Sequence, residues 1–490
     1  MRLESLIEAL RPRQVAGPTT ADIRGVACDS RCVAPGFLFA ALRGANQDGH
    51  RFVADAVARG AVAVICEECP RPPPSGAAVL VVPDARQALA EAAALFHGCP
   101  ARKLQTFGIT GTNGKTTTAF MIRAALEAAG RKTGLIGTIQ YLIGERAIPA
   151  SRTTPESVEL QDLLDQMTRV GCRAAVMEVS SHSLVQKRVW GIEFDFRVFT
   201  NLTHDHLDFH GSVDEYFRAK SMLFTPPPPG GKPFVSVLNL DDPCGERLAV
   251  QCASGCELLT FGEDPRAAVR AERVALDARG SQVEIASPWG RHGLRLRFLG
   301  RYNVSNALAA FAAACAAGVP PEAVLRALEG MAPVPGRLEP VPTGRGFHVF
   351  VDYAHTQDAL QNVLSTLREL GPRRLIVLFG CGGNRDRRKR PLMGAVAACL
   401  ADRVIVTSDN PRREKPSTII AEIMMGIERR DHVEVIEDRR EAIKRALAAA
   451  GPGDIVLVAG KGHENYQELE NTVIPFDDRQ VVKECLDRLP

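Results

Sequence analysis

The 490-residue sequence predicts an α/β protein of three domains. A central parallel-sheet domain of the P-loop type is expected between an N-terminal α/β domain and a C-terminal Rossmann-like domain. Short apolar runs alternate with helical patterns along most of the chain, which is typical of parallel sheets covered by helices. The length suits about three domains of roughly 150 residues. Boundaries are expected near residues 100–103 and at the proline-rich stretch 333–336, giving domains at 1–102, 103–335 and 336–490.

Each domain has its own run of expected elements. After an amphipathic helix within residues 1–14, the first domain has expected strands at 36–41, 62–66 and 79–82 and helices at 50–59 and 85–97. The second has expected strands at 104–109, 133–139, 174–179, 196–201 and 233–238, an antiparallel insert at 269–298, and helices at 119–129, 302–317 and 321–329. The third has expected strands at 349–351, 375–379, 403–407, 433–435 and 455–459 and helices at 357–370, 391–400, 416–427, 439–449 and 478–489. A proline run at 226–229 is expected to form a rigid turn or linker.

Composition excludes several classes of protein. A net charge of +3 provides no general attraction to nucleic acid, so no nucleic-acid partner is expected. No apolar run is long enough to span a membrane, and no apolar segment of the signal-peptide type follows the first charged residues, so we expect a cytoplasmic protein. The thirteen cysteines are scattered, and the pair Cys66 and Cys69 stands alone, which favours free thiols over a zinc site.

A glycine-rich loop at residues 108–115 is the strongest functional signal. It follows an apolar strand, ends in Lys115-Thr116 and opens a helix. Glycines let backbone N–H groups surround phosphate oxygens, and the helix N-terminus adds positive potential. Lys115 is expected to reach the terminal phosphates, and the Thr116 hydroxyl to bind Mg²⁺. The loop therefore predicts ATP binding.

Further candidates follow the loop along the chain. Glu178 ends an apolar strand, where a carboxylate can hold Mg²⁺, although a solvated glutamate is the alternative. Residues 201–210 carry three histidines and two aspartates, which suit either a zinc site or one histidine at a second Mg²⁺. Lys220 lies among apolar residues, and the residues alone favour an ordinary lysine that extends its ammonium group to solvent.

Two segments of the last domain predict recognition of an amino acid. A basic run at residues 380–390 follows a strand, where arginines are better suited to carboxylate or phosphate than to nucleic acid. Residues 409–412, Asp-Asn-Pro-Arg, follow the next strand. An acid and an arginine presented together match a ligand that carries both an ammonium and a carboxylate group.

Taken together, these motifs resemble the Mur ligases, which add amino acids to the peptidoglycan precursor. The likeness covers nearly the whole chain and its domain order. The motifs that carry it are residues 29–31, 110–117, 153–155, 178–182, 205–208, 219–220, 303–306, 335–337, 352–355, 409–412 and 460–464. Within the family, Asn-Pro-Arg at 410–412 accompanies meso-2,6-diaminopimelate, whose distal carboxylate an arginine can pair, whereas lysine-adding relatives lack this arginine.

The resemblance implies a reaction and its cofactors. ATP would phosphorylate the D-Glu side-chain carboxylate of UDP-N-acetylmuramoyl-L-alanyl-D-glutamate, and the amine of meso-2,6-diaminopimelate would attack the acyl phosphate. Two Mg²⁺ ions and a CO₂-derived carbamate on Lys220 would assist a protein expected to be a monomer. An L-lysine-adding or other Mur-type amide ligase is the alternative, and an ATP-dependent switch protein without bond-forming chemistry is a more distant one.

Residue roles are implied by the same resemblance. The catalytic group would be Lys115, Lys220, Glu178 and His206, with metal ligands Thr116, Glu178, His206 and Lys220. ATP would contact Thr110, Gly111, Thr112, Asn113, Gly114, Lys115, Thr116, Thr117, Asn303, Arg337 and Asp352. The UDP-linked substrate would contact Cys28, Ser30, Ala45, Asn46, Gln47, Thr153, Thr154, Ser180, Gln186 and Arg188. The amino acid would contact Arg385, Asp409, Asn410, Pro411, Arg412, Gly460 and Glu464.

Overall fold

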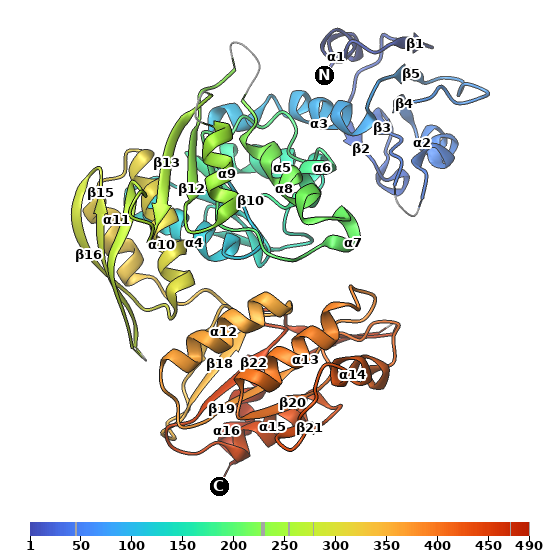
Figure 1. Cartoon of the computed structure of the whole chain (residues 1–490). Helices are drawn as coiled ribbons and strands as arrows, with labels where there is room; N and C mark the ends of the chain where they lie inside the picture. Colours follow the sequence, from blue (N-terminus) through green and yellow to red (C-terminus); the bar gives the residue numbers. More distant parts are fainter. Residues whose placement is uncertain (45–46, 227–230, 253–254, 278, 471, 490) are drawn as a thin grey trace.

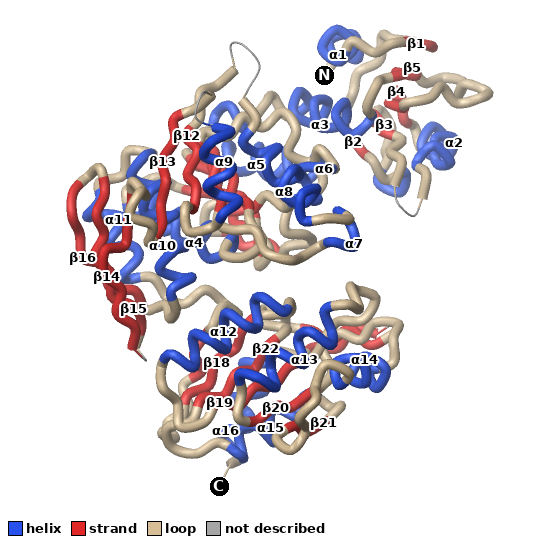
Figure 2. Tube along the Cα trace, in the orientation of Figure 1, coloured by secondary structure: helices blue, strands red, loops and turns tan. Residues whose placement is uncertain are grey.

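The computed structural model describes residues 1–44, 47–226, 231–252, 255–277, 279–470 and 472–489. Three sheets follow one another along the chain, and the part containing the second lies between the other two (Figure 1). Helices cover the strands of each sheet, as the tube view shows (Figure 2). In the described ranges, no helix combines the length and apolar character needed to cross a membrane.

The first sheet has five strands in the order β1-β5-β4-β3-β2, with β1 antiparallel and the others parallel. Its strands are β1 (Gln14–Ala16), β2 (Gly25–Ala27), β3 (Phe37–Ala40), β4 (Ala61–Cys66) and β5 (Ala78–Val81). Its helices are α1 (Leu3–Leu10), α2 (Val53–Ala58) and α3 (Ala85–Phe96), with short 3₁₀ turns at Ser30–Cys32, Gly49–Phe52 and Pro100–Lys103. Apolar side chains on both faces of the sheet form two separate clusters, so the sheet is buried on both sides.

The second sheet has eleven strands in the order β16-β15-β14-β13-β12-β11-β6-β10-β7-β8-β9. Its strands are β6 (Gln105–Thr110), β7 (Thr133–Ile136), β8 (Gln140–Ile143), β9 (Arg146–Pro149), β10 (Ala174–Glu178), β11 (Phe196–Phe199), β12 (Val235–Asn239), β13 (Glu257–Gly262), β14 (Val269–Asp277), β15 (Gly280–Ser287) and β16 (Gly290–Leu296). Its helices are α4 (Lys115–Ala128), α5 (Ser157–Arg169), α6 (Ser181–Val185), α7 (Leu207–His210), α8 (Val213–Ser221), α9 (Pro243–Cys252), α10 (Arg301–Ala316) and α11 (Pro321–Gly330), with a 3₁₀ turn at Met222–Phe224. The central strands β7, β10, β6, β11, β12 and β13 run parallel, so the ends of β6, β10 and β11 bring their following residues to one edge.

The third sheet has six strands in the order β17-β18-β22-β19-β20-β21, all parallel except the edge strand β17. Its strands are β17 (Glu339–Val341), β18 (His348–Asp352), β19 (Leu375–Phe379), β20 (Arg403–Val406), β21 (Val433–Val435) and β22 (Ile455–Ala459). Its helices are α12 (Gln357–Glu369), α13 (Lys389–Leu400), α14 (Pro416–Met424), α15 (Arg439–Ala449) and α16 (Asp478–Arg488), and a hairpin of β23 (Tyr466–Leu469) and β24 (Thr472–Pro475) follows β22. Helices α12, α13 and α14 pack together on one face, and α15 and α16 on the other.

The α/β fold class predicted from sequence is confirmed. The expected antiparallel segment at residues 269–298 is present as two hairpins, and it extends the central sheet because β14 pairs with β13. Sequence patterns missed β1, β2, β8, β9, β13, β17 and the β23–β24 hairpin, most of which are only three or four residues long. Most of the proline run at 226–229 lies outside the described residues. The division at residues 102 and 335 stays a prediction.

Candidate active site

The phosphate loop joins β6 to α4 and is fixed to the neighbouring strand β11. The backbone N–H of Thr112 donates to Asn201 O at 2.8 Å, and the Thr200 hydroxyl donates to Asn113 O at 2.6 Å. Gly114 has φ +85°, and a Cβ there would lie 2.3 Å from Asn306 Oδ1. The loop therefore needs glycine at this position, both for its conformation and for its close packing against α10.

Lys115 begins α4, and its side chain folds back over the loop. Its Nζ donates to Gly111 O and Thr112 O, each at 2.8 Å. Burial lowers the pKa of this lysine, and the nearby carboxylates of Glu178 and Asp205 oppose that effect. A cation is thus held at the mouth of the loop, where the terminal phosphates of a nucleotide would lie.

Glu178 ends β10 and is almost fully buried. Its Oε2 accepts hydrogen bonds from the Thr116 hydroxyl at 3.0 Å and the Thr138 hydroxyl at 2.9 Å, and its Oε1 accepts from Thr138 N at 2.8 Å. The predicted pair Thr116 and Glu178 is therefore in direct contact. A buried carboxylate beside a hydroxyl provides the hard oxygen ligands that Mg²⁺ prefers, so these residues fit a magnesium ion. Thr153 joins this group through Thr138, with 3.1 Å between their hydroxyl oxygens.

Lys220, on α8, also contacts the phosphate loop. Its side chain is almost fully buried, its Nζ donates to Gly111 O at 2.8 Å, and the ring of Tyr216 lies 4.4 Å from the nitrogen. Gly111 O therefore accepts from both Lys115 and Lys220. Burial and the like charge of Lys115 hold the pKa of Lys220 well below its ordinary value. The solvent-exposed lysine suggested by the residues alone is wrong.

His206 lies between the loop and a group of aromatic rings. Its backbone has φ +53°, and its Nε2 is 3.5 Å from Asp205 Oδ2. Its ring meets that of His182 edge-on, with 4.8 Å between centroids, and His182 lies 5.5 Å from His210. Burial is the main cause that lowers the pKa of both His182 and His210 to about 4.

The zinc alternative for residues 201–210 is not supported. Among the described residues, no group of three or more His, Cys, Asp and Glu side chains is arranged to hold a metal ion. Lys115 and Lys220 are among the charges acting on His206, so this histidine faces the loop region.

Three predicted ATP contacts behave differently from one another. Arg337, just after the hinge, donates to the Thr116 hydroxyl at 3.1 Å and stacks on the ring of Tyr353. Asp352 uses both carboxylate oxygens to accept backbone N–H groups of Leu338 and Ala354, at 2.6 and 2.7 Å. Asn303 is buried on α10 and bonded to Leu299 O at 2.8 Å. Arg337 reaches Thr116 at the start of α4, whereas Asp352 and Asn303 bond to backbone groups near themselves in the chain.

A carboxylate of the third domain also contacts the phosphate loop. Asp358, in the first turn of α12, accepts hydrogen bonds from Asn113 Nδ2 at 2.8 Å and from the Thr203 hydroxyl at 3.0 Å. Burial raises the pKa of Asp358, and the hydrogen bonds from Thr203 and Asn113 counteract it. The first contact joins α12 to the phosphate loop, and the second joins it to the segment that follows β11.

A cavity of about 880 Å³ lies between the second and third domains. The second domain lines it with residues that include Thr138, Thr153, Asp205 and His206. The third domain contributes Tyr353, His355, Arg385, Lys389, Asp409, Asn410, Arg412, Gly460, His463 and Glu464. The predicted magnesium ligand His206 and most of the predicted amino-acid contacts thus border one space.

The floor of this cavity in the third domain is an interlinked polar group. Asn410 Nδ2 donates to Glu464 Oε2 at 2.8 Å, and Lys461 Nζ donates to Asn410 Oδ1 at 3.0 Å and Glu464 Oε2 at 3.2 Å. Gly460 has φ +113°, and a Cβ there would lie 2.6 Å from Asp409 Oδ2. Glycine at this position lets the Asp409 carboxylate approach the end of β22.

Two arginines predicted to bind a carboxylate line the same cavity. Arg412 pairs with Glu468 at 2.9 Å and donates to Gly383 O at 3.0 Å, while Arg385 is exposed. Arg390, from the same basic run, is fully buried and pairs with Glu414 and Glu422. Arg385 of the basic run thus lines the cavity, whereas Arg390 is buried in ion pairs. This division does not favour a nucleic-acid-binding surface.

Those predicted contacts for the UDP-linked substrate that the structure describes lie on the first two domains, near their junction. Ser30 is buried at the start of a 3₁₀ turn, and burial raises the pKa of the Cys28 thiol to about 11, with Glu156 adding to the shift. Gln47 is exposed, and Ala45 and Asn46 lie outside the described residues.

Across this junction, the second domain contributes a connected set. Arg188 donates to Gln186 Oε1 at 2.6 Å and to Thr154 O at 2.9 Å. The Thr154 hydroxyl accepts from Ser180 N at 3.1 Å and donates to Glu178 O at 2.7 Å. These contacts connect Arg188 through Thr154 to Glu178, beside the phosphate loop.

Sequence reasoning missed several residues of the site. Thr138 holds Glu178, Asp358 holds the phosphate loop, and Lys461 supports Asn410. Lys389 and His355 line the cavity, and Lys389 Nζ donates to His355 O at 2.7 Å. Lys461 and His355 belong to the motifs at residues 460–464 and 352–355, which could have indicated them. The roles of Thr138 and Asp358 depend on strand pairing and domain docking, which sequence motifs do not show.

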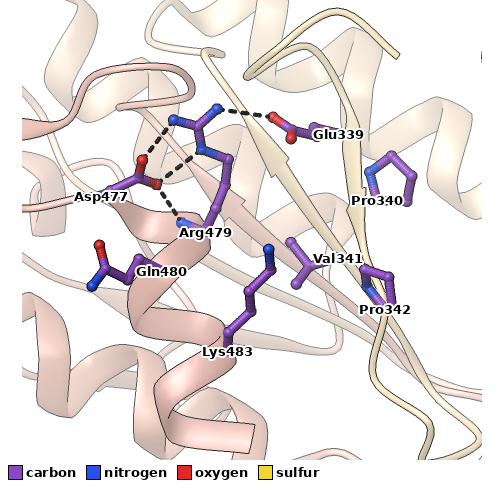
Figure 3. Close-up of a pocket in the computed structure, with 8 residues that line it drawn as sticks. All are labelled: Glu339, Pro340, Val341, Pro342, Asp477, Arg479, Gln480 and Lys483. Carbon is purple, nitrogen blue, oxygen red and sulfur yellow. Dashed lines mark hydrogen bonds and ion pairs between the residues drawn. The ribbon is translucent and has the colours of Figure 1, made fainter. Parts of the chain in front are cut away.

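A second cavity, of about 360 Å³, lies between β17 and α16 (Figure 3). Its Arg479 is already paired with Asp477 at 2.6 Å and with Glu339 at 3.4 Å, and Glu339 also accepts the hinge N–H of Gly336. These charges neutralise one another and support the hinge, so the larger cavity is the better candidate site.

Comparison with known proteins agrees with this arrangement. Models of the Mur ligase family match residues 22–97 (catalytic domain), 109–314 (middle domain) and 336–462 (glutamate ligase domain). Proteins named UDP-N-acetylmuramoyl-L-alanyl-D-glutamate–2,6-diaminopimelate ligase from Geobacter metallireducens and Solibacter usitatus are 45% and 46% identical, and each alignment covers 98% or more of both chains.

A solved structure bearing the same name is 33% identical, with a TM-score of 0.70 and 99% coverage of both chains. A structure of MurF from Acinetobacter baumannii, 21% identical with a TM-score of 0.68, shares the fold. The family expected from the sequence motifs is confirmed: this chain belongs to the Mur ligase family.

Proposed function

We propose that this protein is an ATP-dependent ligase that joins meso-2,6-diaminopimelate to the D-Glu side-chain carboxylate of UDP-N-acetylmuramoyl-L-alanyl-D-glutamate. ATP would phosphorylate that carboxylate, and the amine would displace phosphate from the acyl phosphate, in the synthesis of the peptidoglycan precursor. The observation that carries the proposal is the shared cavity, where Thr153, Asp205 and His206 face Asp409 and Arg412 across the domain boundary. Relatives that bear the corresponding name along their full length support it.

The proposed nucleotide site is the loop from Thr110 to Thr117, with Arg337 arriving from beyond the hinge. Lys115 and Arg337 would face the phosphates and offset the negative charge that builds up in phosphoryl transfer. Thr116 and Glu178 would hold one Mg²⁺, which would neutralise phosphate oxygens when bound. Asn303 and Asp352 would act mainly by holding the surrounding backbone.

His206 and Lys220 are proposed to hold a second Mg²⁺, with Lys220 carbamylated. Formation of a carbamate requires a neutral amine, and Lys220 is buried beside a second cation, which favours its neutral form. Carbamylation would also turn a nitrogen donor into an anionic oxygen ligand suited to Mg²⁺. Lys220 and Lys115 both donate to Gly111 O, and loss of the Lys220 ammonium charge would end this competition.

The amino acid is proposed to bind on the floor of the cavity. Asp409 and Glu464 would receive an ammonium group, and Arg412 and Arg385 a carboxylate. Arg412 is the residue that would distinguish diaminopimelate from lysine. Lysine has no distal carboxylate, so it would make no ion pair with Arg412, which would keep Glu468 as its partner.

The UDP-linked substrate is proposed to extend from the first domain, near Cys28 and Ser30, along Arg188 and Thr154 to the phosphate loop. Ser180, Gln186, Thr153 and residues 45–47 would complete this site. A monomer working in the cytoplasm, where ATP is available, remains our expectation, as do the domain boundaries at 102 and 335.

The test is an acceptor panel. Purified protein is given ATP, Mg²⁺ and the UDP-linked dipeptide, and ADP release and ligated product are measured with meso-2,6-diaminopimelate, L-lysine, D-glutamate and no amine. We expect product with diaminopimelate. A preference for L-lysine would reject the specificity and support the alternative ligase. ADP release without product for every amine would favour a nucleotide-driven switch.

A further inference from the structure

A fully buried lysine lies beneath the proposed amino-acid site. Lys461 follows β22, and none of its side chain is exposed. Its Nζ donates to Asn410 Oδ1 at 3.0 Å and to Glu464 Oε2 at 3.2 Å, and the ring of Tyr466 lies 5.4 Å from it. Burying an ammonium group is costly unless it is paired and hydrogen-bonded, so this lysine depends on both partners.

The first partner, Asn410, has its amide orientation set by this lysine. Asn410 Oδ1 accepts from Lys461 Nζ and from the backbone N–H of Glu468, each at 3.0 Å. Two donors at the oxygen direct the amide nitrogen the other way, where it donates to Glu464 Oε2 at 2.8 Å. Removing the lysine would take away one of the two donors that fix this orientation.

The second partner, Glu464, has its charge supported by this lysine. Burial raises the pKa of Glu464 and the like charge of Asp409 adds to it, whereas Lys461 lowers it. Tyr353, Tyr466 and Arg439 are further ionisable groups that interact electrostatically with this carboxylate.

The two oxygens of Glu464 have different surroundings. Oε2 accepts both hydrogen bonds, from Asn410 and from Lys461. Across the described ranges of the chain, Oε1 accepts none, and Glu464 lines the cavity. This oxygen is therefore available to a ligand that donates hydrogen bonds.

We propose that Lys461 is a positioning residue for the amino-acid substrate, holding Asn410 and Glu464 in the arrangement that receives an ammonium group of the incoming diamino acid. Lys461 acts through these two side chains and does not itself touch the substrate. The inference rests on the proposed function, because the ligand it serves is the acceptor amine of that reaction.

The test compares Michaelis constants in wild type and Lys461→Met, which keeps the length of the side chain and removes its charge. At about pH 7 we expect KM for diaminopimelate to rise about tenfold or more, the scale of a lost hydrogen bond to a charged group. KM for ATP and for the UDP-linked dipeptide should stay unchanged. Lys483→Met, at an exposed site on α16 of the same domain, is the control and should change none of the three.

Two further measurements separate positioning from general damage. Lys461 lowers the pKa of Glu464, so without this lysine KM for diaminopimelate should rise more steeply as pH falls than it does in wild type. Combined with Glu464→Gln, the lysine substitution should add little further effect, as expected for two residues that act as one unit. If Lys461→Met does not fold, Lys461→Gln serves in its place and should show the same selective rise.

The outcomes are distinct. An unchanged KM for diaminopimelate, an equal rise in all three constants, or parallel pH profiles of this KM in wild type and Lys461→Met would overturn the role of Lys461. Wild-type protein that forms no amide with any diamino acid would instead reject the proposed function, and with it this inference.

Discussion

The contact between the third domain and the phosphate loop yields a quantitative prediction. Asp358 accepts hydrogen bonds from Asn113 at 2.8 Å and from Thr203 at 3.0 Å, both across the domain boundary. Asp358→Ala removes both bonds without altering the hinge. We expect the third domain to spend less time docked on the central domain, and ATP to be used less efficiently as a result.

The size of the effect can be worked from these contacts. Each hydrogen bond to a charged acceptor contributes about 1.5–3 kcal/mol, so the two together contribute at most about 3–6 kcal/mol. Burial of the carboxylate, which raises the pKa of Asp358, offsets part of this gain. A net value of about 1.5–3 kcal/mol remains, which corresponds to a change of roughly tenfold to a hundredfold in the docking equilibrium.

The assay is kcat/KM for ATP, together with small-angle scattering of the substrate-free protein. The variant should lose about tenfold or more in kcat/KM for ATP and show a larger radius of gyration. Asp402→Asn is the matched control, because Asp402 pairs with Arg368 inside the third domain. Equal kcat/KM values and superimposable scattering curves for Asp358→Ala and wild type would refute the reasoning.

Three further predictions follow from the site. Lys220→Ala should abolish ligation, and short added carboxylates should partly restore it; failure of this rescue, together with an unmodified Lys220 in a mass or density measurement, would argue against the carbamate. Gly114→Ala should lower ATP affinity and the melting temperature, because its Cβ would lie 2.3 Å from Asn306 Oδ1 at φ +85°, and calorimetry showing unchanged ATP binding would contradict it. Burial lowers the pKa of His463 to about 3, below its value in the unfolded chain, so this group's contribution to unfolding free energy is present above about pH 6.5 and lost at about 1.4 kcal/mol per pH unit as pH falls toward 3. His463→Gln should therefore show a shallower loss of melting temperature in acid than wild type, and parallel curves would count against it.

Local signals were enough to predict the fold class and the nucleotide loop. Strands β6, β10 and β11 are rich in apolar residues, and the glycine-rich loop that ends in Lys115 and Thr116 follows the first of them. Contact between Thr116 and Glu178 could be expected, because adjacent parallel strands end at the same edge.

Other parts of the site depend on packing that no local pattern encodes. Thr138 reaches Glu178 only because β7 pairs with β10 in the register that sets Ile136 beside Met177. The burial of Lys220 arises where α8 meets the phosphate loop, far away in sequence. Asp358 gains its role from the docking of two domains. Short edge strands such as β1 and β17 were missed because three residues hold too little periodicity to recognise.

The carbonyl oxygen of Gly111 joins two ammonium groups that have different proposed tasks. Two cations on one acceptor repel each other, so drawing Lys115 toward a phosphate, or neutralising Lys220, makes the remaining contact more favourable. Thermodynamic reciprocity then requires each event to shift the equilibrium constant of the other by the same factor. With the proposed carbamate on Lys220, nucleotide affinity should accordingly vary with the partial pressure of carbon dioxide.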